Sequence, residues 1–236
     1  MTIHLAAAMP EGPAPLAAEL PPIPGGWTDE RVTIGGRALR VTRPARPDAF
    51  LDDPEVLSEN ARNDFMPYWA YLWPAARAMA ESVAAVEWPE GLRALEIGAG
   101  IGLVGLAGLL RGLEVTFSDY RALPVELALH NAQQNGFKPA RGMLLDWNEP
   151  LPITFPLILG CDVVYERRSH APILGLVEAM LSPGGAAWFG DVGRQVAAEL
   201  VASARGRGFV VELRDERGEP LNEPQVGRFQ LVVLRR

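Results

Sequence analysis

The stretch that decides the fold is Leu95-Glu96-Ile97-Gly98-Ala99-Gly100-Ile101-Gly102, in which an apolar run leads directly into alternating glycines. This pattern is typical of a buried strand that turns tightly into a helix, because glycine permits the turn and lets a ligand approach the backbone. Asp119 follows about 20 residues later, where a carboxylate can accept hydrogen bonds from ribose hydroxyls. The pattern predicts an adenosine-containing cofactor above the carboxyl ends of two neighbouring strands.

Beyond residue 92, strand patterns alternate with helical patterns of roughly 10 to 15 residues, which indicates a parallel α/β sheet. Strands are expected near 92–97, 114–118, 141–145, 157–161, 186–190, 209–214 and 227–235, and helices near 102–111, 121–135, 170–181 and 194–206. The connection 215–226 has no helical period, so the last two strands are expected to pair as a hairpin. The predicted fold class is α/β, with a Rossmann-like, mostly parallel seven-strand sheet, one antiparallel strand and helices on both faces.

The residues before the sheet predict a smaller extension. Polar and apolar residues alternate around Gly35-Gly36, which predicts a β-hairpin, and 52–64 and 74–86 are expected to be helical. We therefore expect three regions. These are a mobile Pro/Ala-rich arm at 1–26, a hairpin and helical extension packed on the core at 27–90, and a cofactor-binding domain at 91–236.

Composition excludes several classes of protein. The chain has 236 residues, 48% of them hydrophobic, and a net charge of −7, which disfavours binding to nucleic acid or to anionic membranes. Cys161 is the single cysteine, so neither an intrachain disulfide nor a metal site is expected. There is no long apolar run and no basic-flanked leader at the N-terminus. We expect a cytoplasmic protein that is a monomer.

Two cofactors fit the glycine loop. Gly100, Gly102 and Gly105 formally satisfy the dinucleotide fingerprint G-x-G-x-x-G, which keeps an NAD-dependent oxidoreductase as an alternative. Counted from Gly98, however, Leu103 stands where the third glycine belongs. Glu96 inside the strand, followed by G-x-G-x-G, instead resembles the first motif of class I S-adenosylmethionine (SAM) methyltransferases, so SAM is the favoured cofactor.

Two further strand ends face the same crevice. Asp146-Trp147 follows the third strand, where the carboxylate can bind an adenine amino group and the indole can contact the adenine ring. Simple core packing is the alternative for Trp147. Cys161-Asp162-Val163-Val164-Tyr165 ends the fourth strand.

One further motif, Pro67-Tyr68-Trp69-Ala70-Tyr71-Leu72-Trp73-Pro74, precedes the glycine loop. Together with Gly98 to Gly105, Asp146-Trp147 and Leu159 to Tyr165, it resembles family 16 of the seven-strand protein lysine methyltransferases. Within that family, Gly190-Asp191-Val192-Gly193-Arg194 resembles a segment of the members that act on the electron transfer flavoprotein β subunit. From the resemblance and the loop chemistry, the predicted cofactor-binding residues are Trp73, Glu96, Gly98, Ala99, Gly100, Gly102, Asp119, Asp146, Trp147 and Cys161.

The resemblance implies that Asp162 and Tyr165 are catalytic residues on the substrate side. We expect Asp162 to attract and orient the amine of a lysine, and Tyr165 to shape a narrow entry, while a helix N-cap is the alternative role for Asp162. Tyr68, Trp69 and Trp73 are expected to form an aromatic wall that favours a cation.

The expected partner is a protein with a lysine on a basic surface, such as the flavoprotein subunit or a translation protein. A small-molecule N- or O-methyltransferase and a non-catalytic SAM-binding module remain alternatives.

Overall fold

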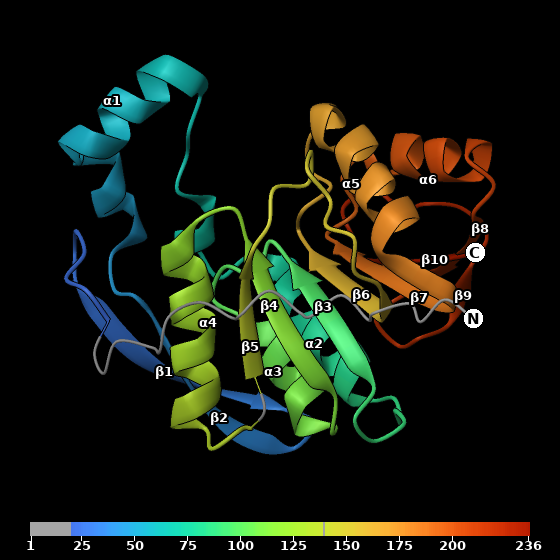
Figure 1. Cartoon of the computed structure of the whole chain (residues 1–236), viewed down its shortest axis with the longest axis horizontal. Helices are drawn as coiled ribbons and strands as arrows, with labels where there is room; N and C mark the ends of the chain where they lie inside the picture. Colours follow the sequence, from blue (N-terminus) through green and yellow to red (C-terminus); the bar gives the residue numbers. More distant parts are fainter. Residues whose placement is uncertain (1–19, 139) are drawn as a thin grey trace, which may run out of the picture.

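The computed structural model describes residues 20–138 and 140–236, and a single large sheet dominates this part of the chain (Figure 1). Its strands lie in the order β5-β4-β3-β6-β7-β10-β8-β9, with β10 antiparallel to both of its neighbours. The strands are β3 (Arg93–Ile97), β4 (Glu114–Asp119), β5 (Ala140–Leu144), β6 (Phe155–Cys161), β7 (Leu181–Asp191), β8 (Val210–Arg214), β9 (Pro220–Leu221) and β10 (Gln230–Arg235). The predicted fold class, including the terminal antiparallel pairing of β8 with β10, is confirmed.

Helices cover both faces of the sheet through two separate apolar clusters. One cluster joins the sheet to Met79, Leu106 and Leu127, and the other joins it to Ile173 and Leu200. The helices of the first face are α2 (Pro74–Ala84), α3 (Leu103–Leu110) and α4 (Ala122–Gln134), and those of the second are α5 (Arg167–Met180) and α6 (Ala197–Gly206).

The described sheet differs from the prediction in two strands. It has an eighth strand, β9, whose two residues pair with the end of β8 inside the connection that was expected to be irregular. A strand this short leaves no alternation in the sequence. β7 begins at Leu181, before the expected start near residue 186, because Leu181 still pairs with Phe155 across an irregular register of β6 and β7.

The predicted hairpin forms from β1 (Trp27–Ile34) and β2 (Arg37–Pro44), and Gly35 and Gly36 both have positive φ at its turn. Asn131 of α4 holds the edge of the hairpin. Its Oδ1 accepts from the Thr42 backbone N–H at 2.7 Å, and its Nδ2 donates to the Thr42 carbonyl at 3.0 Å. The backbone N–H and carbonyl groups of Thr42, at the edge of the hairpin, therefore form their hydrogen bonds with a side chain of α4 and do not need water.

Three short elements connect the hairpin to α2, namely η1 (Pro47–Asp52), α1 (Pro54–Asn63) and η2 (Tyr68–Ala70). Most of the predicted arm, residues 1–19, lies outside the described residues. Within the remainder, Trp27 Nε1 donates to the Pro21 carbonyl at 2.8 Å, and Leu20 packs against the first apolar cluster. The three predicted regions stay predictions. Among the described residues, no helix combines the length and apolar character needed to cross a membrane.

Candidate active site

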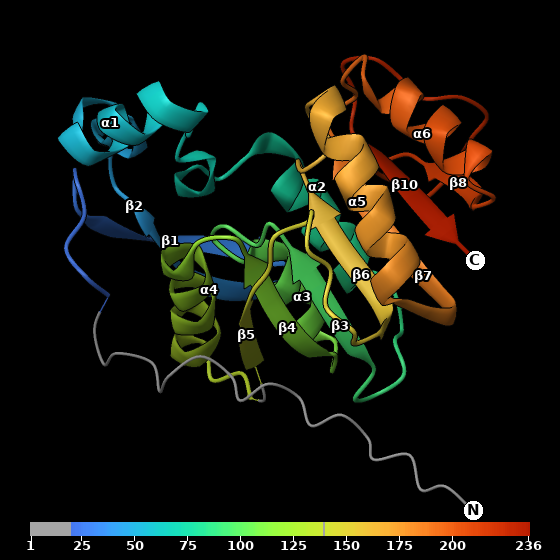
Figure 2. The same ribbon diagram turned by 45° about the horizontal axis from the view of Figure 1, so that its top comes forward.

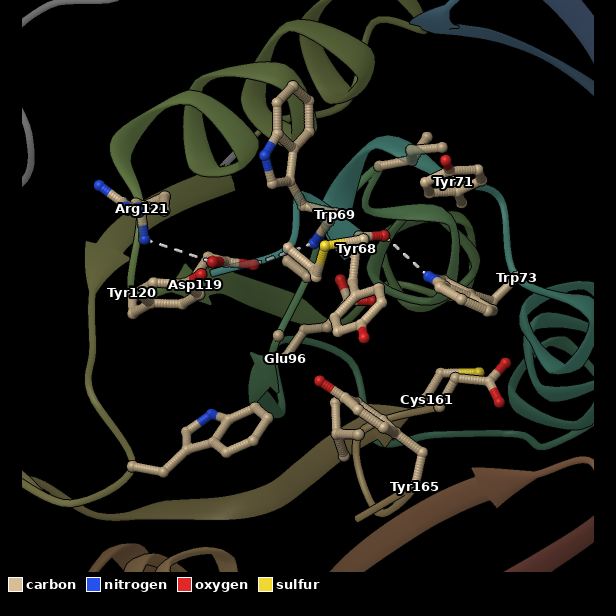
Figure 3. A pocket seen from close by; sticks show the side chains of 18 of the residues that line it. Tyr68, Trp69, Tyr71, Trp73, Glu96, Asp119, Tyr120, Arg121, Cys161 and Tyr165 are labelled. Carbon is tan, nitrogen blue, oxygen red and sulfur yellow. Dashed lines mark hydrogen bonds between the residues drawn. The ribbon is translucent and has the colours of Figure 1, made fainter. Parts of the chain in front are cut away.

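A cavity of about 470 Å³ lies where β3, β4 and β6 end at their carboxyl edges (Figure 3). Its wall includes every residue that the sequence analysis assigned to cofactor binding or catalysis. These are Trp73, Glu96, Gly98, Ala99, Gly100, Gly102, Asp119, Asp146, Trp147, Cys161, Asp162 and Tyr165. Within the described residues, no group of three or more His, Cys, Asp or Glu side chains is placed to hold a metal ion.

The glycines of the loop are required both by their backbone conformation and by the atoms that lie close to them. Gly98, Gly100 and Gly102 all have positive φ, a conformation that L side chains rarely adopt. A Cβ on Gly98 would lie 2.8 Å from Val163 Cγ1 in the cavity wall, whereas a Cβ on Gly102 would lie 2.7 Å from Ala128 Cβ. Gly98 therefore shapes the cavity, and Gly102 is required mainly for the packing of α3 on α4.

Glu96 ties the loop to the following helix. It is almost fully buried, and its Oε2 accepts a hydrogen bond from the Gly105 backbone N–H at 3.0 Å. Burial raises the pKa of Glu96 to about 8, and the nearby Asp119 carboxylate adds to this shift. Glu96 therefore carries a proton at neutral pH, and a cation bound close by would favour its ionised form.

Asp119, the residue expected to bind ribose, is the last residue of β4, and only 5% of its surface is exposed. Its Oδ2 accepts from the Gly100 backbone N–H at 3.4 Å and its Oδ1 from the Arg121 backbone N–H at 3.3 Å, both long contacts. Burial raises the pKa of Asp119 to about 6. A buried carboxylate held by long bonds keeps capacity to accept from a diol, so the site fits the ribose of an adenosine cofactor.

Asp146 and Trp147, the residues expected to contact adenine, line the same cavity as Asp119. Asp146 is exposed, and its Oδ1 accepts from both the backbone and the side-chain nitrogens of Asn148 at 2.8 Å. The Trp147 ring lies over Gly98 and also packs against the second apolar cluster. Trp147 therefore combines the cavity position that was expected with the core packing that was its alternative.

Aromatic side chains form the opposite wall. The Tyr68 ring lies 5.4 Å from that of Tyr165 and 5.9 Å from that of Trp73, centroid to centroid, and Trp73 Nε1 donates to the Tyr68 carbonyl at 2.8 Å (Figure 3). Trp69 also lines the cavity, but its ring packs edge-on against Phe50. Burial raises the pKa of Tyr165 to about 12, so its hydroxyl remains a hydrogen-bond donor at neutral pH. Burial likewise raises the pKa of the Cys161 thiol, which stays neutral.

Asp162 lies in the cavity wall with both carboxylate oxygens engaged. Its backbone is left-handed, with φ of 54°, and its side chain is 2% exposed. Its Oδ2 accepts from the Ala75 backbone N–H at 3.1 Å, in the first turn of α2, and its Oδ1 pairs with the Arg194 guanidinium. Arg194 also pairs with Asp191 at 2.9 Å.

This geometry changes the interpretation of Asp162. The Asp162 carboxylate pairs with the Arg194 guanidinium, so its charge is engaged before any amine enters, and its expected role in orienting the amine stays a prediction. The alternative, a helix cap, describes its contacts better, although the helix that it caps is α2 and not the helix that follows it in sequence.

The sequence analysis missed part of the cavity wall. Glu59 and Phe65, from α1 and the turn after it, and Tyr120 and Arg121 also line the cavity. Tyr120 and Arg121 directly follow Asp119, so their position in the sequence was an available signal. Nothing in the local pattern of α1 indicates that it faces the cavity.

Comparison with known proteins decides the family. Residues 69–189, half of the chain, match the family described as lysine methyltransferase. The chain belongs to this family. Histone-arginine methyltransferase METTL23 of Rattus norvegicus is 30% identical over 156 residues, 61% of this chain and 66% of that protein. Protein N-lysine methyltransferase METTL21A of Mus musculus is 38% identical over 115 residues, 44% of this chain and 52% of that protein.

The match spans about half to two thirds of the length of those two relatives. Among solved structures, the Thermus thermophilus 16S rRNA methyltransferase RsmC, in complex with AdoMet and guanosine, superposes with a TM-score of 0.62. That match covers 92% of this chain and 52% of RsmC at 18% identity, so it shows a shared fold. The expected relation to the members acting on the electron transfer flavoprotein β subunit stays a prediction.

Proposed function

We propose that this protein transfers a methyl group from SAM to the side-chain amine of a lysine in another protein. The observation that carries the proposal is one cavity with a glycine loop and a buried acceptor, Asp119, at one end and an aromatic wall at the other. Bound SAM would supply a methyl group on a positively charged sulfur, open to in-line attack by an amine.

At the cofactor end, the residues present would hold an adenosine and a charged methionine portion. Asp119 would accept hydrogen bonds from the ribose hydroxyls, and Trp147 would pack beside the adenine. Glu96, buried below the loop, would respond to the positive sulfur by losing its proton. Gly98, Ala99 and Gly100 would leave the backbone open to the methionine portion.

At the acceptor end, Tyr68, Trp73 and Tyr165 would receive the lysine. Their rings favour a cation and exclude water around the reacting atoms. The amine must lose a proton before it can attack, and the Tyr165 hydroxyl, which stays protonated, cannot take that proton at neutral pH. The proton would leave to solvent, while Tyr165 orients the amine by hydrogen bonding.

Asp162 would act at this end as a positioning residue. It fixes the start of α2, directly after Trp73, to the end of β6 and to Arg194. Its charge is already paired with Arg194, so it is not a free carboxylate for an incoming cation. The choice of lysine as the acceptor rests on the aromatic wall and on the family match.

SAM affinity should fall as the pH drops below about 6. Asp119 must be ionised to accept both ribose hydroxyls, and its pKa of about 6 places the loss of that form in this range. Above pH 7 Asp119 is fully ionised, so it should cause no further change in SAM affinity. Calorimetric titration of SAM from pH 5 to pH 8 checks the expectation, and Asp119→Asn should remove the component centred near pH 6 while leaving the dependence that Glu96 contributes below about pH 8. An equally steep profile in Asp119→Asn would assign the effect to another group.

Methyl transfer is tested directly by incubating the protein with methyl-labelled SAM and a cell lysate, followed by mass spectrometry of proteins and small molecules. We expect label on lysines of a protein with a basic surface, because the net charge of −7 favours such a partner. Lys138 is the only lysine of this chain, so any other labelled lysine belongs to a substrate. Label confined to small molecules would contradict the proposal.

We further propose that the protein acts as a cytoplasmic monomer.

A further inference from the structure

α1 stands apart from the sheet in both views, on the side of the β1–β2 hairpin (Figures 1 and 2). None of its residues is buried, and it packs chiefly against η1. Yet Glu59 and Asn63 of α1, and Phe65 just after it, line the same cavity as the glycine loop. All of these residues precede the family match, which begins at residue 69.

The Arg121 side chain connects α1 to the cofactor end of the cavity. The Arg121 guanidinium lies 4.5 Å from the centre of the Phe65 ring and 5.3 Å from that of Tyr120, and it forms an ion pair with Glu59. The Phe65 and Tyr120 rings meet edge to face at 6.4 Å. We call Glu59, Phe65, Tyr120 and Arg121 the clasp.

The clasp is continuous with Asp119. The Arg121 backbone N–H donates to Asp119 Oδ1 at 3.3 Å, so the backbone that carries the clasp is bonded to the carboxylate proposed for ribose (Figure 3). The Arg121 Nε atom is buried and has no hydrogen-bond partner within the described chain. A buried donor without an acceptor is costly, so this arrangement is expected to gain stability when an acceptor arrives in the cavity.

We propose that Arg121 is a positioning residue which couples cofactor binding to the placement of α1, so that α1 and Phe65 form the outer wall of the adenosine subsite. The inference rests on the proposed function. It extends the cofactor site to a part of the chain that the family match does not include. Because α1 buries no side chain, the clasp adds to its packing against η1 in holding it there.

Hydrogen exchange measured by mass spectrometry tests the coupling, with S-adenosylhomocysteine as the probe. We expect the probe to slow exchange of the α1 amides at least tenfold in the wild-type protein. In Arg121→Met this protection should be lost and the dissociation constant of the probe should rise about tenfold, with Arg121→Lys restoring part of both. The melting temperature without the probe should hardly change, because α1 contributes nothing to the core.

Arg207→Met is the matched control. Arg207, directly after α6, forms an ion pair with Glu178 of α5 at 3.2 Å and is about as exposed as Arg121, but neither residue lines the cavity. We expect it to leave both readouts unchanged. Exchange of α1 that does not respond to the bound probe, or an Arg121→Met variant that keeps the protection, would overturn the inference. A wild-type protein that does not bind the probe at all would instead overturn the proposed function.

Discussion

Replacement of Asp119 by alanine is expected to weaken SAM binding about 100-fold. The change removes hydrogen bonds from the ribose hydroxyls to a charged acceptor, each worth about 1.5–3 kcal/mol, in a site that is screened from water. It also removes the acceptor of the Gly100 and Arg121 backbone N–H groups on either side of the ribose position. Isothermal titration calorimetry at pH 7.5 measures the change.

The folded protein should tolerate this substitution. Burial raises the pKa of Asp119 to about 6, so the ionised carboxylate at pH 7.5 opposes folding, and removing it relieves a cost that offsets the loss of its two long backbone hydrogen bonds. An unchanged or slightly higher melting temperature would therefore show that lost affinity is not lost structure. A dissociation constant within threefold of wild type would disprove the ribose assignment.

Replacement of Asp162 by alanine is expected to destabilise the protein by about 3–5 kcal/mol and to abolish methyl transfer. The change uncaps α2 and leaves the Arg194 guanidinium with only Asp191 as a counter-ion in a largely buried site. Chemical denaturation measures the loss of stability, and labelling of the identified substrate measures the loss of activity.

Asp162→Asn separates the two roles considered for this residue. The amide oxygen can still accept from Ala75, and Asp191 still neutralises Arg194, so a positioning role predicts near wild-type SAM affinity and less than a tenfold loss in kcat. A role in orienting the amine by charge predicts a loss of at least 100-fold in kcat/KM with stability and SAM affinity intact. That second outcome would restore the direct role that the sequence analysis expected.

The sequence pattern predicted those features of the fold that depend on interactions between neighbouring residues. The glycine loop after β3, the hairpin turn at Gly35-Gly36 and the acidic residue at the end of β4 each depend on a few neighbouring residues. Parallel strands align their carboxyl ends, so motifs spread from Trp73 to Tyr165 could be expected to meet at one cavity.

The features that sequence reasoning missed depend on contacts between distant segments. Arg194 reaches Asp162 across 32 positions, and Arg121 reaches Glu59 across 62, and neither pairing leaves a periodic signal. The capping of α2 by Asp162 could not be predicted either, because a capping residue is recognisable in the sequence only when it directly precedes its helix. The two-residue strand β9 is too short to show alternation.

The central claim is that the cavity at the carboxyl ends of β3, β4 and β6 is a SAM site, and calorimetric titration of the purified protein with SAM and, separately, with NADH tests it most directly. We expect binding of one SAM per chain and no measurable heat from NADH, because Leu103 stands where the dinucleotide fingerprint requires its third glycine. Binding of NADH in place of SAM, or binding of neither, would contradict it.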